Sequence, residues 1–341
     1  MGKQTVLPSG RVQPRFAGIC TFLRTPRLSD VAPANNPVDW AIYGVPFDGG
    51  VTFRPGARFG PRAVRDASQY IKPYSIELGV NVAERWSVAD AGDAPVMPYS
   101  CKETMDSVVA FARGLGDANT RLLAIGGDHS IAYANLRAVW EKRGKKALAV
   151  VHFDAHMDTV DSVWGEKWGH ASPFIRASEE GIVDPKAMIS IGIRGTLNTA
   201  ADLDFAKQHG VTIVTMDEWR RTGAATLAAF LARTKGRETY LTFDVDAVDP
   251  AFAPGTGTPV AGGFTSAEAL AAVRSLRGIN LVGHRRGVAG SGCVGDHRDA
   301  GGAVDAGCDG GVRGSRCTTE TQRHGGMPLV EGIRSGLPLA Q

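Results

Sequence analysis

Short apolar runs alternate with longer segments of helical spacing along this 341-residue chain. Three of the runs, at 122–125, 148–151 and 240–243, lead directly into segments rich in Gly, Asp and His. Apolar runs of this length, closed by Gly or Asp, are typical of buried parallel strands. Further strands are expected at 40–45, 86–89, 189–193, 211–215 and 279–283, and helices at 61–70, 102–115, 131–143, 224–233 and 266–277. This alternation predicts an α/β fold, a three-layer αβα arrangement with a mainly parallel central sheet.

The pattern also divides the chain into three parts. Residues 1–37 are rich in proline and are expected to form an N-terminal arm on the surface. Residues 38–283 carry the strand–helix alternation and are long enough for one large domain with its own core. Residues 284–341 are atypical, because 284–326 are rich in Gly, Arg, Asp and Cys and show no apolar periodicity. We expect this last segment to be disordered.

Composition excludes several classes of protein. The formal net charge of +3 is too small to indicate a nucleic-acid partner. No apolar stretch reaches membrane length, and the first residues lack the apolar core of a signal peptide. The five cysteines contain no Cys-x-x-Cys pair, which argues against a disulfide framework or a structural zinc. A reducing cytoplasm is the simplest location.

Acidic residues and histidines follow three of the predicted strands. In parallel α/β sheets the carboxyl ends of neighbouring strands meet at one edge, where ligands bind. Six donors exceed what one divalent ion takes while keeping an open position, whereas two ions about 3.5–4 Å apart account for all of them. Carboxylates with some imidazole favour Mn²⁺ over a soft metal. A single such cluster would be explained better by helix caps and surface polar residues, but three clusters predict a two-manganese centre. The six expected ligands are His129, Asp154, His156, Asp158, Asp244 and Asp246.

The motifs around these residues resemble the signatures of the ureohydrolase family, which includes arginase, agmatinase, guanidinobutyrase and proclavaminate amidinohydrolase. The chain carries Gly-Gly-Asp-His-Ser, Phe-Asp-Ala-His-x-Asp and Phe-Asp-Val-Asp-x-x-Asp-Pro, and the resemblance covers roughly 17–283. It implies an arginase-like fold, and an oligomer that is a homotrimer or homohexamer, with a hetero-oligomer as the alternative. It also implies that His129 and Asp158 bind one manganese and that His156 and Asp246 bind the other. Asp154 and Asp244 would then bridge the two ions.

The family reaction hydrolyses a small guanidino substrate to urea and an amine by attack of a metal-bridging hydroxide. By resemblance, His170 relays the proton to the leaving amine, although Ala171 stands where the family more often has glycine. The loop 164–168 and the Arg-Pro-Gly-Ala-Arg pattern at 54–58 look agmatinase-like or guanidinobutyrase-like rather than arginase-like. Asp161 and Glu166 would then bind the free amine of agmatine, or be ordinary solvated loop charges. Guanidinobutyrate and other substituted guanidines are the alternative substrates.

The C-terminal segment departs from the family. The resemblance implies a last strand that continues into Asp-Val-Val-Glu, whose glutamate holds the guanidinium, and no such motif follows residue 283. Read one base later, the codons of 296–302 permit Ile-Thr-Ala-Thr-Leu-Ala-Ala, as the family has there, so a frameshift explains the segment. Val288 cannot become glutamate in that frame, and a lineage-specific tail is the alternative. Without this glutamate, an inactive or weakly active subunit is a further hypothesis.

Overall fold

The computed structural model describes residues 5, 9–32 and 36–286. Its centre is an eight-stranded sheet in the order β4-β1-β5-β10-β9-β6-β7-β8. Every neighbouring pair in this sheet is parallel. The strands are β1 Trp40–Val45, β4 Val88–Asp93, β5 Arg121–Gly126, β6 Leu148–Phe153, β7 Val183–Ile193, β8 Thr212–Thr215, β9 Glu238–Phe243 and β10 Asn280–Arg286. A separate antiparallel pair is formed by β2 Tyr74–Ser75 and β3 Val80–Asn81. The predicted α/β class with a parallel central sheet is confirmed.

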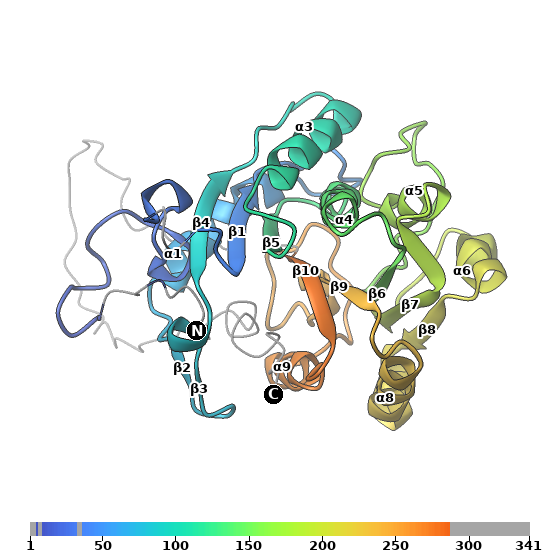
Figure 1. Cartoon of the computed structure of the whole chain (residues 1–341). Helices are drawn as coiled ribbons and strands as arrows, with labels where there is room; N and C mark the ends of the chain where they lie inside the picture. Colours follow the sequence, from blue (N-terminus) through green and yellow to red (C-terminus); the bar gives the residue numbers. More distant parts are fainter. Residues whose placement is uncertain (1–4, 6–8, 33–35, 287–341) are drawn as a thin grey trace, which may run out of the picture.

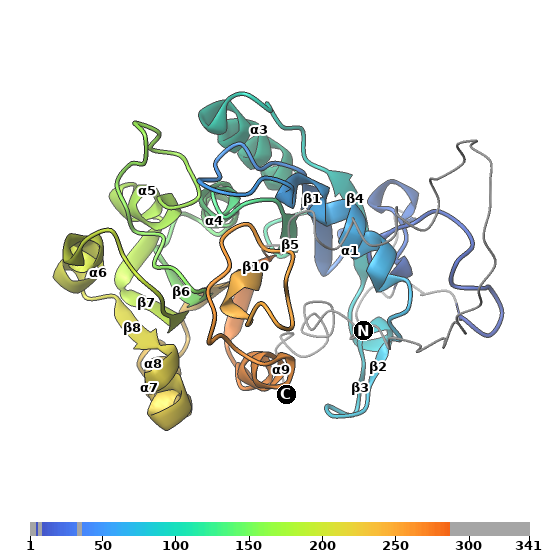
Figure 2. The ribbon, with the colours of Figure 1, turned by 180° about the vertical axis from the view of Figure 1, so that it is seen from behind.

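Helices cover both faces of the sheet (Figures 1 and 2). One apolar core lies beneath α3, α4 and α5, and a second lies beneath α1, α8 and α9. Strands covered on both faces are apolar at nearly every position, which explains why they read as continuous apolar runs. The helices are α1 Gly60–Ser68, α2 Val82–Arg85, α3 Cys101–Arg113, α4 Ile131–Lys142, α5 Pro173–Glu179, α6 Asp204–His209, α7 Met216–Glu218, α8 Ala224–Arg233 and α9 Ser266–Arg274.

Local sequence signals set several helix ends. Pro61 lies in the first turn of α1, where its fixed φ suits the helix and its missing N–H costs nothing. Ser100 caps α3 by accepting a hydrogen bond from the backbone N–H of Glu103. Thr265 begins α9 with a reciprocal capping box that includes Glu268. These caps fix where each helix begins relative to the strand before it.

The N-terminal arm packs against the edge strand β4. Its described part contains two short 3₁₀ turns, η1 Phe22–Arg24 and η2 Leu28–Asp30. Phe22 is fully buried in the second core, and its backbone N–H donates to Asp90 of β4 over 2.9 Å. The arm therefore covers part of an edge that would otherwise present unpaired backbone groups.

β10 lies in the middle of the sheet, between β5 and β9, although it comes last in the described chain. The sequence predicted a strand at 279–283 and a disordered segment from 284. The backbone of residues 284–286 instead continues the strand and pairs with β5 and β9. Ladder hydrogen bonds are made by the backbone, so a polar stretch can extend a strand without any apolar signal. The rest of the atypical segment, and the frameshift hypothesis with it, lie outside the described residues.

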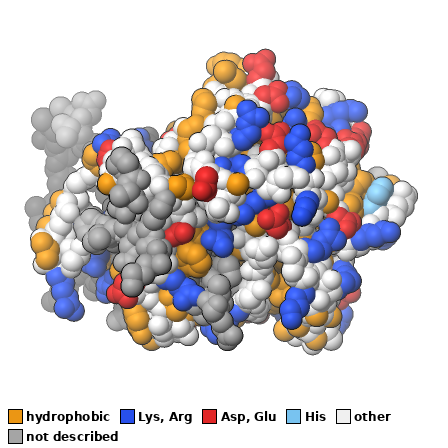
Figure 3. Space-filling model, viewed as in Figure 1, with side chains coloured by type: hydrophobic (Ala, Val, Ile, Leu, Met, Phe, Trp, Pro, Cys, Tyr) orange, Lys and Arg blue, Asp and Glu red, His pale blue; other side chains and the backbone are white. Residues whose placement is uncertain are grey.

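The surface carries no charge of one dominant sign on the face shown in Figure 3, where Lys and Arg side chains alternate with Asp and Glu. This agrees with the small net charge of +3. Within the described residues, no helix combines the length and the hydrophobicity needed to cross a membrane.

Candidate metal centre

The strand order brings the three acidic clusters together. They follow β5, β6 and β9, and these strands lie within four neighbouring positions of the sheet, with β10 between β5 and β9. The turn after β5 depends on Gly127, which has φ of +47°. A Cβ at this position would lie 2.4 Å from the Phe47 carbonyl oxygen, so only glycine fits. This turn places His129 at the carboxyl edge of the sheet.

The predicted ligands fall into two adjoining groups. In the first, His129 Nδ1 lies 2.7 Å from Asp158 Oδ2, 2.8 Å from Asp154 Oδ2 and 3.4 Å from Asp244 Oδ2. In the second, His156 Nδ1 lies 3.1 Å from Asp246 Oδ2 and 3.4 Å from Asp154 Oδ1. The structure therefore brings all six residues together, and the two oxygens of Asp154 face different histidines. Asp154 could therefore offer one oxygen to each of the two groups.

Nearby positive charge would stabilise the carboxylates of this cluster. Burial and the neighbouring charge of Asp154 raise the pKa of Asp158 well above its usual range, and they raise that of Asp246 as well. Burial also acts to raise the pKa of Asp154, but hydrogen bonds from His129, His152 and His156 hold it well below the usual value. Several carboxylates buried side by side cannot all ionise at low cost without a compensating positive charge. The donor set and its burial thus fit divalent metal ions.

His170, the predicted proton relay, lines the same pocket as the six ligands. Its Nε2 lies 2.8 Å from Thr52 Oγ1 and accepts the Thr52 backbone N–H over 3.2 Å. Its own backbone N–H donates to the Gly50 carbonyl over 3.0 Å. Burial lowers the pKa of His170, while the negative charge of Asp128 acts in the opposite direction. Thr52 and Gly50 therefore hold His170 in the lining of the pocket, and its role as a proton relay stays a prediction.

Asp161 and Glu166, the predicted contacts for a substrate amine, do not line this pocket. Asp161 forms an ion pair with Arg176, and its side chain is 60% exposed. Glu166 accepts the backbone N–H of Trp168 over 2.7 Å and is exposed. Asp161 is thus paired with α5, and Glu166 with the backbone of its own loop. Arg54, from the agmatinase-like pattern, does line the pocket.

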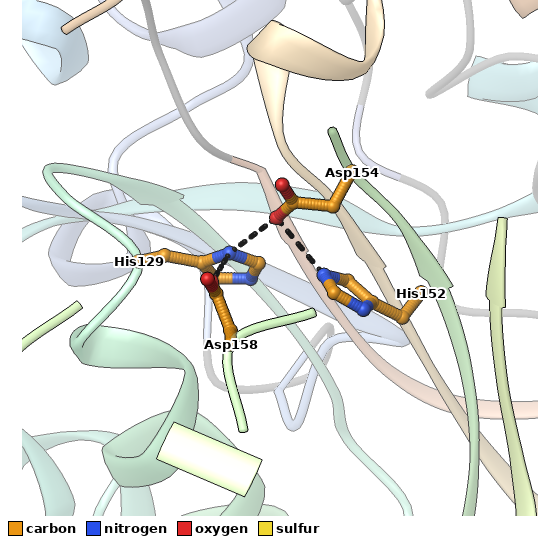
Figure 4. A group of neighbouring side chains, drawn as sticks. All are labelled: His129, His152, Asp154 and Asp158. Carbon is orange, nitrogen blue, oxygen red and sulfur yellow. Dashed lines mark hydrogen bonds and ion pairs between the residues drawn. The ribbon is translucent and has the colours of Figure 1, made fainter. Parts of the chain in front are cut away.

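Two polar residues of the strands were missed by sequence reasoning. His152 of β6 is completely buried and lies beside the first group of ligands, with Nε2 2.9 Å from Asp154 Oδ2 (Figure 4). Thr242 of β9 is also completely buried, and its Oγ1 lies 2.9 Å from His129 Nε2. That contact leaves His129 Nδ1 to face the carboxylates. The available signal was a polar residue inside an otherwise apolar strand, directly before a ligand cluster.

Comparison with known proteins places this geometry in a family. Residues 38–284 match the arginase family. Proclavaminate amidinohydrolase of Streptomyces clavuligerus is 42% identical over 273 residues, which cover 80% of this chain and 85% of that protein. Its solved structure superposes with a TM-score of 0.76 at 36% identity, covering 95% of this chain and 97% of the other.

The names of two further relatives refer to other substrates. Guanidinopropionase of Pseudomonas aeruginosa is 42% identical over 272 residues, 79% of this chain and 83% of that protein. The mitochondrial agmatinase of Gallus gallus is 36% identical over 279 residues, 82% of this chain and 80% of that protein. The chain thus belongs to the arginase family and is an amidinohydrolase of guanidino compounds with a buried histidine–aspartate cluster at its site.

Proposed function

We propose that this protein hydrolyses a linear guanidino compound to urea and an amine with two manganese ions held by the six predicted ligands. The observation that carries the proposal is the position of Asp154, whose two carboxylate oxygens face the two histidines of separate ligand groups. Oxygen and imidazole donors without thiolate suit manganese. When bound, such a pair of ions supplies a water molecule of lowered pKa as the nucleophile.

The other steps belong to residues of the chain. His170 lines the pocket and would give a proton to the leaving amine, as a general acid. Thr52 holds the His170 ring through its backbone N–H and its hydroxyl. The family resemblance implies a glutamate around the guanidinium directly after the last strand, but no Asp-Val-Val-Glu motif follows residue 283 in this sequence.

For the tail of the substrate, we favour a carboxylate over an amine. An amine such as that of agmatine would need an acidic partner, and the two acidic residues expected for it lie outside the pocket lining. Arg54 lines the pocket and is exposed, and no ion pair ties its guanidinium to another described residue. The similarity to a guanidinopropionase supports the same substrate class. Agmatine is the second candidate, because an agmatinase is also among the relatives.

A urea-release assay with manganese-loaded protein tests both parts of the proposal. The substrates are 3-guanidinopropionate, 4-guanidinobutyrate, agmatine and arginine. We expect urea from at least one guanidino acid, with a higher kcat/KM than for agmatine. No urea from any of the four, in protein that holds two ions per chain, would contradict the proposed reaction.

The role of Arg54 is tested by Arg54→Gln. Loss of a charge-assisted contact costs about 1.5–3 kcal/mol when the pair is well formed. We therefore expect kcat/KM for the guanidino acid to fall by about 10- to 100-fold, mainly through KM, and the value for agmatine to stay or rise. Arg62→Gln is the matched control, because Arg62 is exposed on α1 and does not line the pocket. Equal effects of the two variants would point to agmatine or another substrate without a carboxylate.

A further inference from the structure

The buried His152 belongs to a polar row that crosses the sheet beneath the ligand groups. His152 of β6 is in register with Ser190 of β7 on one side and with Thr242 of β9 on the other. All three side chains are completely buried. Residues in register on parallel strands project from the same face of the sheet. A row of three buried polar residues inside an apolar sheet is costly unless its members form hydrogen bonds.

Both nitrogens of His152 have partners. Nε2 lies 2.9 Å from Asp154 Oδ2, and Nδ1 lies 3.0 Å from Ser190 Oγ. An ionised carboxylate only accepts hydrogen bonds, so Nε2 must carry the proton that is shared with Asp154. In the neutral ring Nδ1 is then the acceptor, and the Ser190 hydroxyl donates to it. Ser190 thereby fixes the tautomer that presents an N–H to Asp154.

The Asp154 carboxylate is consequently held by a donor on each oxygen. Oδ1 accepts the backbone N–H of His156 over 2.7 Å, and Oδ2 accepts Nε2–H of His152. Oδ2 is also the oxygen that lies 2.8 Å from His129 Nδ1 (Figure 4). Rotation of the carboxylate would break one of these two bonds. Each oxygen therefore stays directed toward its own ligand group.

We infer that His152, held by Ser190, is a positioning residue that orients Asp154 as the bridge between the two metal sites. The inference rests on the proposed two-manganese function. His152 does not act as a ligand in this arrangement, because Nε2 is occupied by Asp154 and Nδ1 faces Ser190. Its ring also packs against Phe174, with the ring centroids 4.6 Å apart, which limits how far it can turn. Removing His152 should therefore lower most the affinity for the ion that Oδ2 faces. That ion is the one beside His129 and Asp158.

Manganese-binding isotherms of the metal-stripped full-length protein test this role. His152→Leu removes the donor, whereas His152→Gln keeps an N–H near the position of Nε2. Loss of an outer hydrogen-bond partner typically weakens metal affinity by about 10- to 100-fold. We expect a loss of that size for one of the two Mn²⁺ ions in His152→Leu, with a smaller change for the other ion. His152→Gln should lie closer to the unchanged protein.

Two further variants complete the experiment. Ser190→Ala should lower the affinity for the same ion by a smaller factor, because the His152 ring remains but its tautomer is no longer fixed. Tyr43→Phe is the matched control, since it removes a buried 2.7 Å hydrogen bond to Asn135 away from the pocket lining and should leave both affinities unchanged. If His152→Leu does not fold, Ser190→Ala and His152→Gln decide the question.

Several outcomes would overturn the inference. Unchanged affinity in both His152→Leu and Ser190→Ala would show that the hydrogen bond does not position Asp154. If His152→Leu lowers the affinity for both ions equally, and His152→Gln does not restore it, His152 has only a general packing role. Binding of only one ion by both His152 variants would make His152 a direct ligand. Fewer than two ions in the unchanged protein would instead reject the proposed function, so the two failures are distinguishable.

Discussion

Individual residues of the metal centre show which parts of the site can be predicted from the sequence. That the six predicted ligands lie close together could be predicted because each follows a strand, and strand ends converge on one edge of the sheet. His152 could not, because a histidine inside an apolar strand gives no sign of what its ring nitrogens contact. From its loop position Asp161 could be a substrate contact or a solvated charge, and the fold places Arg176 next to it. Pairings between distant residues of this kind depend on tertiary structure.

Manganese should compete with protons for this cluster. Burial acts to lower the pKa of His156 in the metal-free chain, but the charges of Asp246 and Asp154 outweigh it and raise this pKa to about 12. At neutral pH the imidazole therefore carries a proton that a metal must displace. We expect manganese affinity to rise with pH, by roughly tenfold per unit for each proton released. Titration calorimetry in buffers of different ionisation enthalpy measures the protons released, and an affinity independent of pH between 6 and 8 would contradict this assignment.

His170→Ala should separate chemistry from metal binding. General acid–base catalysis typically contributes about 10²- to 10⁴-fold to the rate. We expect kcat for urea release to fall within that range while the manganese content stays near that of the unchanged protein, because His170 lies in neither ligand group. Elemental analysis beside the urea assay measures both quantities. An unchanged kcat across the pH range would remove His170 from the reaction.

At the scale of elements, the apolar pattern predicts which segments form strands and helices. It predicts less well where the edge strand β4 ends and which elements it contacts. β4 was expected at 86–89 and runs from Val88 to Asp93, because its last residues are polar and pair by backbone alone. The polar end of β4 carries Asp90 and Asp93, which bind Arg65 of α1. Asp90 also accepts the backbone N–H of Phe22 from the arm. One carboxylate thus joins the arm, α1 and the edge strand.

Arg65→Ala should destabilise the fold strongly. The Arg65 and Asp90 side chains are only 12% and 4% exposed, so the substitution leaves a buried charge without its main partner. Breaking a buried pair in this way typically costs about 3–5 kcal/mol. Lys102→Ala is the comparison, because the Lys102–Asp106 pair is 46% and 56% exposed and should contribute about 0.5 kcal/mol or less. Urea unfolding measures both, and similar free energies of unfolding for the two variants would show that Arg65 does not hold the arm to the sheet.

At the scale of the whole molecule, the feature least visible in the sequence is the position of β10. Loss of apolar character after residue 283 suggested that the domain ends there. The sheet nevertheless closes its centre with this strand, which pairs along both sides with β5 and β9 up to Arg286. In the described structure, the backbone ladder joins the two halves of the sheet, β4-β1-β5 and β9-β6-β7-β8, through β10. The ligand clusters after β5 and β9 lie on opposite sides of that junction.

Limited trypsin digestion of the native protein locates the end of the paired strand. The bond after Arg285 is a trypsin site, but its backbone is hydrogen-bonded to two neighbouring strands, and cleavage there requires the centre of the sheet to open. The bonds after Lys145 and Lys146 lie in an exposed turn between α4 and β6 and serve as the control. We expect mass spectrometry to show cleavage at the control bonds well before cleavage after Arg285. Cleavage after Arg285 at the control rate would place the end of the stable domain near Gly283, as the apolar pattern suggested, and would mean that the two halves of the metal centre are joined by a shorter strand.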